Sequence, residues 1–444
     1  MRGAASAGPE EDAGVARPPA EGGVPARLSR FGNIYVLILL VAINIVNYAD
    51  RTLISVLAPA IQRELSLSDT QVGAITGLAF ALTYGMAGLM IARWADRYGH
   101  ARVLVTAVAV WSVMCLLTAH VRSFAQLFIV RLGLGIGESG AAPASLALIH
   151  GGFSTRARPI AFAIFSAGTT VGIGAGVALG GWLGSEYGWR KTMALMAIPG
   201  LLLALLFAAT VRQPAAAVTR RSGAGGSVLS VISGIATDPL RRSLTCAYAC
   251  ASFAYAGFAQ WAPTFYMRDH GMSMREVGAT YSVTSSGGAL FGILLGGIVG
   301  GRTLARNPAL ALRLCGVLAL CAAAASASAF LVADRSLSLL LFALFGVAAG
   351  ATYAPTIAMF QEHSPASTLA FANAAMLLVA VILGQGFGPF SIGLASDMLH
   401  DGGVGTPLAM ALVIASASLL FSAGFQFAAS RAMRRKSAVP QTEI

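Results

Sequence analysis

The sequence predicts an all-α polytopic membrane protein with about twelve transmembrane helices in two bundles of six. Of the 444 residues, 56% are hydrophobic and only 11% are charged, whereas about a quarter of the residues of a soluble domain are charged. Apolar stretches of about 20 residues, the length that crosses a bilayer, recur along the chain. The longest polar connection divides these stretches into two sets of six. A water-soluble fold is therefore excluded.

The first set of apolar stretches follows a polar amino-terminal segment. Residues 1–32 mix acids, arginines, prolines and glycines, so we expect a disordered cytoplasmic tail rather than a signal peptide. The predicted spans of this half occupy residues 33–57, 72–91, 103–120, 124–149, 159–183 and 192–211. Residues 33–211 are thus predicted to form the amino-terminal six-helix bundle.

The second set begins after a connection rich in Ser, Gly, Arg and Ala. We interpret this segment, residues 212–239, as a cytoplasmic linker. The spans that follow occupy residues 243–266, 277–300, 309–332, 337–361, 366–396 and 406–429. They predict a carboxy-terminal bundle over residues 240–430, followed by a basic cytoplasmic tail over residues 431–444.

The distribution of positive charge predicts the orientation in the membrane. With the amino terminus inside, connections on the inner side carry 21 Lys and Arg residues and connections on the outer side carry 7. Because inner loops are enriched in these residues, both termini are expected in the cytoplasm. The net charge of +12 therefore indicates a bilayer and not a nucleic acid as partner. Lys191 and Lys436 are the only lysines, a composition that we associate with a high-GC bacterium and hence with the inner membrane.

Neither a metal nor another cofactor is predicted. All five cysteines lie within apolar runs, without the spacing of zinc ligands. We interpret them as small packing residues.

Four ionisable residues fall inside predicted spans, where each costs about 2.5–3.5 kcal/mol on insertion scales and is usually functional. Asp50 and Arg51 belong to the first span, and Arg131 and Glu138 belong to the fourth. A helix rises 1.5 Å per residue, which places Asp50 and Arg131 at similar depths of roughly 13 and 10 Å below the outer boundary. The two acids and two bases are therefore expected to pair within the bundle.

This cluster predicts proton coupling. Burial disfavours an ionised carboxylate and a nearby guanidinium favours it, so an arginine that changes partners alters proton affinity. We expect Asp50 and Glu138 to bind and release protons, and Arg51 or Arg131 to exchange between these acids and an anionic substrate group. The alternative is a static ion network that only fixes helix packing.

The connection between the second and third spans carries an ordered motif. Residues 88–102 read GLMIARWADRYGHAR, which resembles the cytoplasmic loop motif of the major facilitator superfamily, with Ala92 and Ala101 as departures. The resemblance covers nearly the whole chain and implies two six-helix bundles that work by alternating access. It also implies a cytoplasmic latch between the halves, made by Asp96, Arg97, Gly99 and Arg102, that holds the outward-open state. The matching loop of the second half, around Arg302, lacks the acid, so the latch is expected to be asymmetric, with its acidic residue in the first half.

Several motifs further resemble the spinster-like branch of that superfamily. They are NYADR at residues 47–51, RLGLGIGES at 131–139, QWAPT at 260–264, GFGP at 386–389 and GLASD at 393–397. The resemblance implies a proton-coupled transporter of a lysophospholipid or sphingosine-type lipid, with the buried charges as coupling residues.

Aromatic and polar side chains predict a cavity for an amphipathic ligand with charges at one end. The candidate lining residues are Tyr48, Tyr84, Phe258, Trp261, Tyr353 and Gln385. Phe265 and Tyr266, near the outer boundary, are instead expected in the interfacial belt. The glycines of residues 168–181, spaced about four apart, are expected to form the seam against the second half.

Two other functions use parts of the same sequence. Proton-coupled transport of small organic anions or drugs would need the same buried charges. Residues 137–140, GESG, have the form found in rhomboid intramembrane proteases, but all six histidines lie at or beyond span ends, so a base for Ser139 is missing. We therefore expect a monomeric transporter, not an enzyme, whose partners are a small amphipathic substrate, protons and the bilayer.

Overall fold

The computed structural model describes residues 30–211, 228–365 and 368–438. Its described residues form helices and no strands, which confirms the predicted all-α class. Most of the predicted amino-terminal tail, much of the linker and the end of the carboxy-terminal tail lie outside the described residues.

The amino-terminal half contains six membrane-crossing segments. Several are broken into consecutive helices, including a π-helical turn in the second. Their bounds are α1 Arg30–Leu65; α2 Asp69–Gly73, η1 Ala74–Leu78 and α3 Ala79–Tyr98; α4 His100–Thr118; α5 Phe124–Ser139 and α6 Ala141–Gly152; and α7 Arg158–Thr210.

Helix α7 holds two predicted spans in one assigned element. Gly188 interrupts it with φ 76° and ψ 162°, a backbone conformation that favours glycine because other residues clash there. The chain turns at this glycine, so the fifth and sixth spans lie on either side of it.

The predicted linker contains a helix. Residues Val228–Thr237 form α8, which packs against α9 and α15. The segment VLSVISGIAT is apolar, and this explains why it folds onto the bundle although the residues before it are polar.

The carboxy-terminal half repeats the six-segment pattern. Its bounds are α9 Pro239–Arg268; α10 Met274–Glu276, η2 Val277–Tyr281, α11 Ser282–Leu295, η3 Gly296–Gly300 and α12 Gly301–Arg306; α13 Pro308–Leu331; α14 Arg335–Glu362; α15 Leu369–Ala380, η4 Val381–Gly386 and α16 Phe387–Asp401; and α17 Pro407–Ala438.

Nine helices of the described residues are long and apolar enough to cross a membrane. One of them is α7, which contains two spans. The continuous helical segment formed by α2, η1 and α3 occupies the predicted second span, and helix α9 occupies the seventh. Both are long but less apolar. Together these helices account for the predicted twelve.

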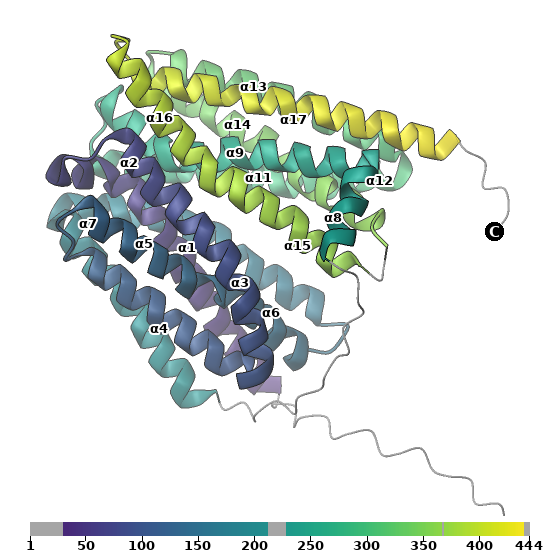
Figure 1. The fold of residues 1–444 in the computed structure, drawn as a ribbon, viewed down its shortest axis with the longest axis horizontal. Coiled ribbons are helices and arrows are strands. Elements are labelled where there is room, and N and C mark those ends of the chain that lie inside the picture. The colour runs from purple at the N-terminus through teal and green to yellow at the C-terminus, as the bar shows by residue number, and fades with distance from the viewer. Residues whose placement is uncertain (1–29, 212–227, 366–367, 439–444) are drawn as a thin grey trace, which may run out of the picture.

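The two halves pack side by side and differ in how their ends meet (Figure 1). We name the ends after residues in the connections: the Asp69 end and the Asp96 end. The largest buried apolar cluster runs through both halves and includes Leu57 of α1 and Phe258 of α9. Two smaller clusters stay within one half each, around Leu104 in the first half and Leu312 in the second. The halves therefore share a core towards the Asp69 end and have separate cores towards the Asp96 end.

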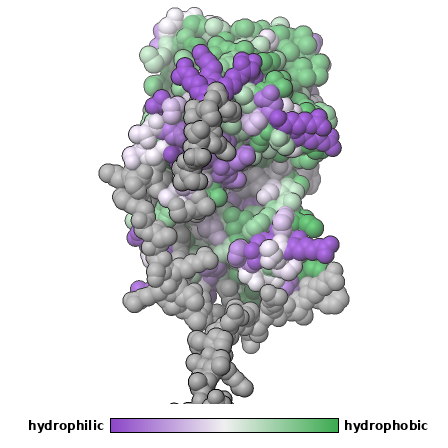
Figure 2. All heavy atoms as spheres, turned by 90° about the vertical axis from the view of Figure 1, so that its right-hand side faces the viewer, coloured by the Kyte–Doolittle hydropathy of each residue, from purple (hydrophilic) through white to green (hydrophobic). Residues whose placement is uncertain are grey.

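The Asp96 end carries hydrophilic side chains on both halves, as Figure 2 shows in a view onto that side of the molecule. Arg102 and Arg156 of the first half and Arg306 of the second are exposed there. Among the described residues, these three charges are exposed and not buried between the halves. Because the buried cores are also separate towards this end, we interpret it as the open one.

The glycines of the fifth span correct the expectation of a single seam. Cβ atoms placed on Gly168, Gly172 and Gly180 would meet residues of α1, in the same half. Only the neighbouring helix face, with Gly181, meets the second half, where a Cβ would lie 2.6 Å from the Cα of Gly278. The prediction was therefore wrong for the glycines spaced four apart, because they pack against α1 and let α1 and α7 approach each other closely.

Candidate functional site

The four buried charges lie together in the amino-terminal half, on α1 and α5. Arg51 donates to Glu138 through Nη2 at 2.5 Å and through Nε at 3.0 Å, both to Oε2. The Glu138 side chain has 0% exposed surface and that of Arg51 has 19%. Hydrogen bonds between ionised groups are about twice as strong as neutral ones. This pair is the ordered part of the cluster.

Aromatic rings surround the same guanidinium. The Cζ atom of Arg51 lies 4.4 Å from the ring centre of Phe80, 5.0 Å from that of Tyr48 and 5.3 Å from that of Tyr84. The rings of Phe80 and Tyr84 stack on each other at 5.2 Å. Cation–π attraction at such distances is worth about 0.5–2 kcal/mol. Arg51 is thus held in an aromatic cage, with part of its surface still accessible.

Asp50 is the unpaired acid of the cluster. Its residue is 2% exposed and it forms no ion pair with a described residue; the indole of Trp111 lies within reach of its carboxylate. Arg131, 4% exposed, lies close enough to Asp50 and Glu138 to interact electrostatically with both, but it forms no ion pair with either, and its Nε has no partner. The second oxygen of Glu138 is also unpaired.

The cluster therefore contains two acids and two bases but only one ion pair. A buried polar network that is only partly satisfied is costly. The energy of the cluster therefore depends on the position of each guanidinium relative to the two carboxyl groups.

Three further residues complete the surroundings. Trp111 of α4 is buried and lies within hydrogen-bonding reach of Asp50, and Cys115 is buried within electrostatic reach of the charges. Asn47, one turn before Arg51 on α1, is also buried and lies near Glu138. Asn47 belongs to the NYADR motif but had no predicted role, although its polar side chain in an apolar span is a signal that could have identified it as a member of the site.

The predicted cavity residues fall into two groups. Tyr48 and Tyr84 lie at Arg51. Tyr353 is 47% exposed and its ring lies 5.8 Å from that of Tyr248, on the second half. Gln385 is half-buried in η4, where this helix meets Gly77. These four have accessible surface.

Phe258 and Trp261 lie elsewhere. Both are 0% exposed, inside the apolar cluster that the two halves share, and therefore line no accessible surface in this conformation. Phe258 packs edge-on against Phe330 and Phe345, and Trp261 donates through Nε1 to the carbonyl of Pro389 at 2.8 Å. Their role here is to position α9 against its neighbours.

The expectation that Phe265 and Tyr266 face the interface was wrong. They are 1% and 0% exposed. Tyr266 accepts a hydrogen bond from Ser338, and both rings pack on His270. Sequence position alone placed them near the boundary but did not show which helix face they occupy.

The latch residues lie at the open end. Arg97 and Arg102 are exposed, and the guanidinium of Arg97 lies over the ring of Tyr98 at 5.3 Å. Gly99 has φ 92°, which turns the chain between α3 and α4. The side chain of Asp96 lies outside the described residues, so the latch stays a prediction.

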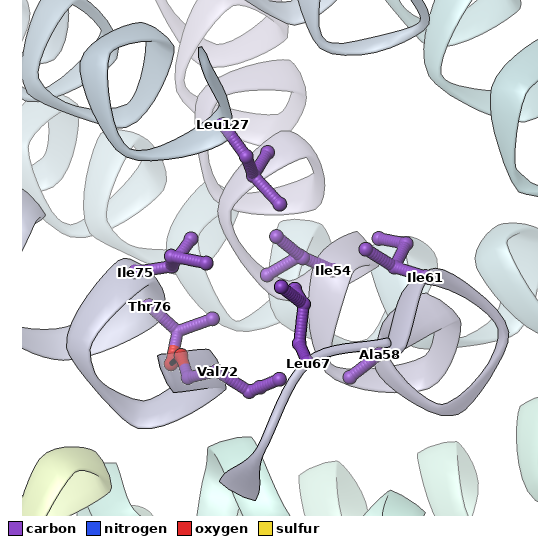
Figure 3. A pocket seen from close by; sticks show the side chains of 8 residues that line it. All are labelled: Ile54, Ala58, Ile61, Leu67, Val72, Ile75, Thr76 and Leu127. Carbon is purple, nitrogen blue, oxygen red and sulfur yellow. Dashed lines mark hydrogen bonds between the residues drawn. The ribbon is translucent and has the colours of Figure 1, made fainter. Parts of the chain in front are cut away.

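A small apolar pocket lies beside the charges, towards the Asp69 end (Figure 3). Ile54 and Leu127 line it. Ile54 lies one helical turn after Asp50 on α1, and Leu127 lies one turn before Arg131 on α5. In Figure 3 side chains from α1, η1 and α5 converge, and Thr76 is the one polar side chain among those that line the pocket. This layer separates the charges from the Asp69 end.

Comparisons with known proteins agree with this architecture. The family model of the Major Facilitator Superfamily matches residues 40–389. An MFS-type efflux pump of Mycolicibacterium smegmatis is 33% identical over 411 residues, which cover 89% of this chain and 92% of that protein. Protein spinster homolog 1 of Xenopus laevis is 27% identical over 53% of this chain and 46% of its own length.

Solved structures extend the likeness to the fold. The crystal structure of a bacterial homolog of the human lysosomal transporter spinster, inward-facing and unoccupied, has a TM-score of 0.82 and 27% identity. The comparison covers 93% of this chain and 100% of that one. The nucleoside transporter NupG matches at a TM-score of 0.70 with 12% identity, which is a likeness of fold alone.

Proposed function

Because the chain belongs to the major facilitator superfamily and resembles its spinster-like members, we propose that it is a proton-coupled transporter of an amphipathic lipid. A lysophospholipid or a sphingosine-type lipid is the proposed substrate. The observation that supports proton coupling is Asp50, a buried acid next to the Arg51–Glu138 pair that itself forms no ion pair with a described residue.

The proposed cycle uses one guanidinium and two acids. When Glu138 is ionised, it holds Arg51 in the ion pair described above. Proton binding to Glu138 weakens its attraction for Arg51 and frees this guanidinium for an acidic group on the substrate. Release of the proton restores the ion pair and expels the anion. A ligand shifts the two conformations only by binding one of them more tightly, and the freed arginine supplies this difference.

The surroundings of Arg51 support a substrate with both an acidic head group and an apolar body. The guanidinium is the charged group of the cluster with accessible surface, and Tyr48, Phe80 and Tyr84 surround it. Aromatic walls with one cationic group favour a ligand that is apolar along most of its length.

A second candidate is transport of small organic anions or drugs. The relatives favour it: besides the efflux pump, a probable L-galactonate transporter of Escherichia coli is 30% identical over 44% of this chain and 43% of its own length. An acidic sugar would use the same arginine but would gain little from the aromatic cage.

We further propose that the protein works as a monomer in a bacterial inner membrane with both termini in the cytoplasm. The excess of Lys and Arg in alternate connections supports this orientation. The Asp96 end then faces the cytoplasm, and the structure represents an inward-open state.

Flux into proteoliposomes tests the substrate. A labelled lysophospholipid and a labelled sugar acid are compared, each with and without a pH gradient. We expect saturable lysolipid flux that rises with the gradient. Flux of the sugar acid with an inert lysolipid would contradict the lipid proposal and favour the second candidate. The exposed acid variant Asp401→Asn serves as the control for reconstitution, because Asp401 lies at the end of α16, far along the chain from the cluster.

A further inference from the structure

Trp111 lies where four helices of the first half meet. It belongs to α4, is 0% exposed, and packs in the apolar cluster that includes Ile43 of α1 and Leu134 of α5. Its indole lies within hydrogen-bonding reach of the Asp50 carboxylate. A tryptophan N–H that is buried usually finds an acceptor. The contact therefore connects α4 to the buried acid of α1.

The positions of these residues along their helices agree with the contact. Asp50 follows Ile43 on α1 by about two turns and precedes Leu53 by about one. Trp111 packs in the same cluster as Ile43. Cys115, one turn further along α4, packs in the same cluster as Leu53, and it lies within electrostatic reach of Asp50. The turn of α4 from Trp111 to Cys115 is thus level with Asp50.

Two glycines let neighbouring helices approach Trp111 closely. A Cβ on Gly137 of α5 would lie 2.7 Å from the backbone nitrogen of Trp111 and 3.1 Å from its Cα. A Cβ on Gly200 of α7 would collide with the hydroxyl of Ser112 and lie 3.6 Å from the indole nitrogen of Trp111. Because small residues at a crossing allow close approach of helix backbones, these glycines hold the indole in place from the sides of α5 and α7.

A second contact between an indole and a carboxylate, in the same half, shows what is particular to Asp50. Trp189 donates through Nε1 to Glu64 at 2.6 Å. The Glu64 side chain is 48% exposed and also pairs with Arg190, so water and a guanidinium share the stabilisation of its charge. Asp50 is 2% exposed and has no ion pair with a described residue. A donor to a buried carboxylate matters more, because water cannot replace it.

The other groups near Asp50 are ionisable, whereas the indole is neutral. The ionisable groups that face Asp50 or its neighbour Tyr48 are Arg131 and Glu138 of α5, Cys115 of α4, and Tyr248 and Tyr255 of α9. The stretch of α7 that packs on α1, residues 168–180, contains no ionisable residue. The indole N–H is a donor only, so it favours the ionised form of Asp50 without adding charge to the cluster.

We propose that Trp111 is a positioning residue for proton coupling, whose indole N–H donates to the ionised carboxylate of Asp50. The bond weakens when Asp50 takes up a proton, because hydrogen bonds to a charged acceptor are stronger. Since α1, α4, α5 and α7 all belong to the first half, the bond does not depend on how the two halves meet. The inference rests on proton binding to Asp50 in the proposed function.

Infrared difference spectroscopy tests the proposal without any substrate. The full chain is studied in nanodiscs, and the carbonyl stretch of protonated carboxylic acids is followed as the pH changes. The part of this band that is lost in Asp50→Asn belongs to Asp50. Trp111→Phe keeps an aromatic ring and removes the N–H. Trp182→Phe is the matched control, because it removes an indole of the same half that is 47% exposed on α7.

The proposal predicts a shift in the titration of Asp50. In Trp111→Phe the Asp50 band should persist to a pH about one unit higher than in the wild-type protein, because the ionised form has lost its donor. Gly200→Ala keeps the indole but displaces it, and it should shift the band in the same direction. This second variant serves if Trp111→Phe does not fold. Trp182→Phe should leave the titration unchanged.

Several results would overturn the proposal. One is an Asp50 band that titrates at the wild-type pH in the folded Trp111→Phe or, if that variant does not fold, in Gly200→Ala. Others are an equal shift in Trp182→Phe, and a shift confined to a band that remains in Asp50→Asn, which would assign the indole to Glu138. These outcomes leave the proposed function intact. If Asp50→Asn removed no band at all, proton binding to Asp50 would be contradicted, and both proposals would fail.

Discussion

At the scale of single residues, neighbours on one helix take different roles in the charge cluster. Asp50 and Arg51 are adjacent, so their side chains point about 100° apart around α1. Arg51 faces Glu138 of α5 and the rings of Tyr48 and Phe80, whereas Asp50 is buried and forms no ion pair with a described residue. The result is one accessible cation and one inaccessible acid. In the proposed function, the substrate and the proton bind to neighbouring but separate groups.

The cage around Arg51 leads to a prediction about substrate affinity. Arg51→Lys keeps the charge but loses the planar, two-point contact with Glu138 and much of the stacking on Phe80. We expect KM for the transported anion to rise about tenfold, with a smaller rise for Phe80→Leu. Initial rates of uptake over a range of substrate concentrations measure this. Arg63→Lys, at the exposed end of the same helix, is the control and should leave KM unchanged; an unchanged KM in Arg51→Lys would remove the guanidinium from the binding site.

The rarity of charges in apolar spans was sufficient to predict the members of this cluster. It was not sufficient to predict their pairing. Equal depth favoured Asp50 with Arg131, but the structure pairs Arg51 with Glu138. The depth of a residue in the membrane follows from counting residues. The direction in which its side chain points depends on the rotation of the helix about its axis, which tertiary packing decides. The same limitation explains the wrong prediction for Phe265 and Tyr266: the sequence predicted their depth in the membrane but not whether their side chains are buried.

At the scale of elements, the two halves meet on glycine. The second and eleventh segments cross at Gly77 and Gly386, and the fifth and eighth cross at Gly181 and Gly278. Removal of every side chain at a crossing lets backbones approach closely, which compensates for the missing hydrophobic drive between helices in lipid. Glycine density in the spans predicted close packing but not the partner helix, because a helix has several faces and each can carry its own stripe.

The crossing of the second and eleventh segments gives a prediction about stability. Gly77→Ala places a methyl group against the Gly386 carbonyl, and overpacking of this kind costs about 1–3 kcal/mol. Thermal unfolding in detergent should show a lower transition temperature. Gly287→Ala is the matched control, since a Cβ there meets nothing within 4 Å; alanine should be neutral or stabilise by up to about 1 kcal/mol. Equal stability of the two variants would argue against a tight crossing.

Asp238 joins α9 and α17 at the Asp96 end. It caps α9 by accepting from the backbone of Leu240 and Arg241, and Lys436 of α17 donates to it at 2.8 Å. Burial would raise the pKa of Asp238, but the hydrogen bond from Lys436 and the backbone hydrogen bonds outweigh this and hold the pKa below its usual range. The ionised form therefore stabilises the fold at neutral pH.

The sign of this effect predicts a pH dependence. A group whose pKa is lowered on folding contributes stability above its unfolded pKa, and this stability is lost as the pH falls through the folded value. Asp238→Asn keeps the cap and removes the charge, so it should lower the free energy of unfolding by about 0.5–1 kcal/mol at neutral pH. The difference in the free energy of unfolding between the two proteins should disappear below about pH 4. Thermal unfolding of both proteins across this range checks it; a gap that persists in acid would assign the loss to something other than charge.

At the scale of the whole molecule, the buried cores describe the conformational state. One apolar cluster spans both halves, while the two others belong to one half each. Rigid halves that share a core at one end and separate at the other can exchange these ends by rocking, which is how transporters with internal repeats alternate access. The small pocket at Ile54 and Leu127 lies on the Asp69 side of the charges.

Most of this architecture could be predicted from the sequence. Span length, the division into six and six, and the resemblance of the loop and helix motifs predicted the fold. The α8 helix inside the linker was missed because its apolar run of residues 228–237 is too short to span a membrane and stands beside a polar segment. The contacts of Asp69 with Arg268 and of Asp397 with the backbone of Asp69 and Thr70 were not predicted, because these residues have the pattern of ordinary loop charges until the fold brings them together.

The central claim is that the buried acids couple proton movement to transport, and one measurement tests it most directly. Proteoliposomes containing the wild-type protein, Asp50→Asn, Glu138→Gln or the exposed control Asp401→Asn are assayed for accumulation driven by a pH gradient and for exchange of labelled against unlabelled substrate without a gradient. We predict that Asp50→Asn and Glu138→Gln lose accumulation but retain exchange, and that Asp401→Asn retains both. Full gradient-driven accumulation in both cluster variants would contradict the account.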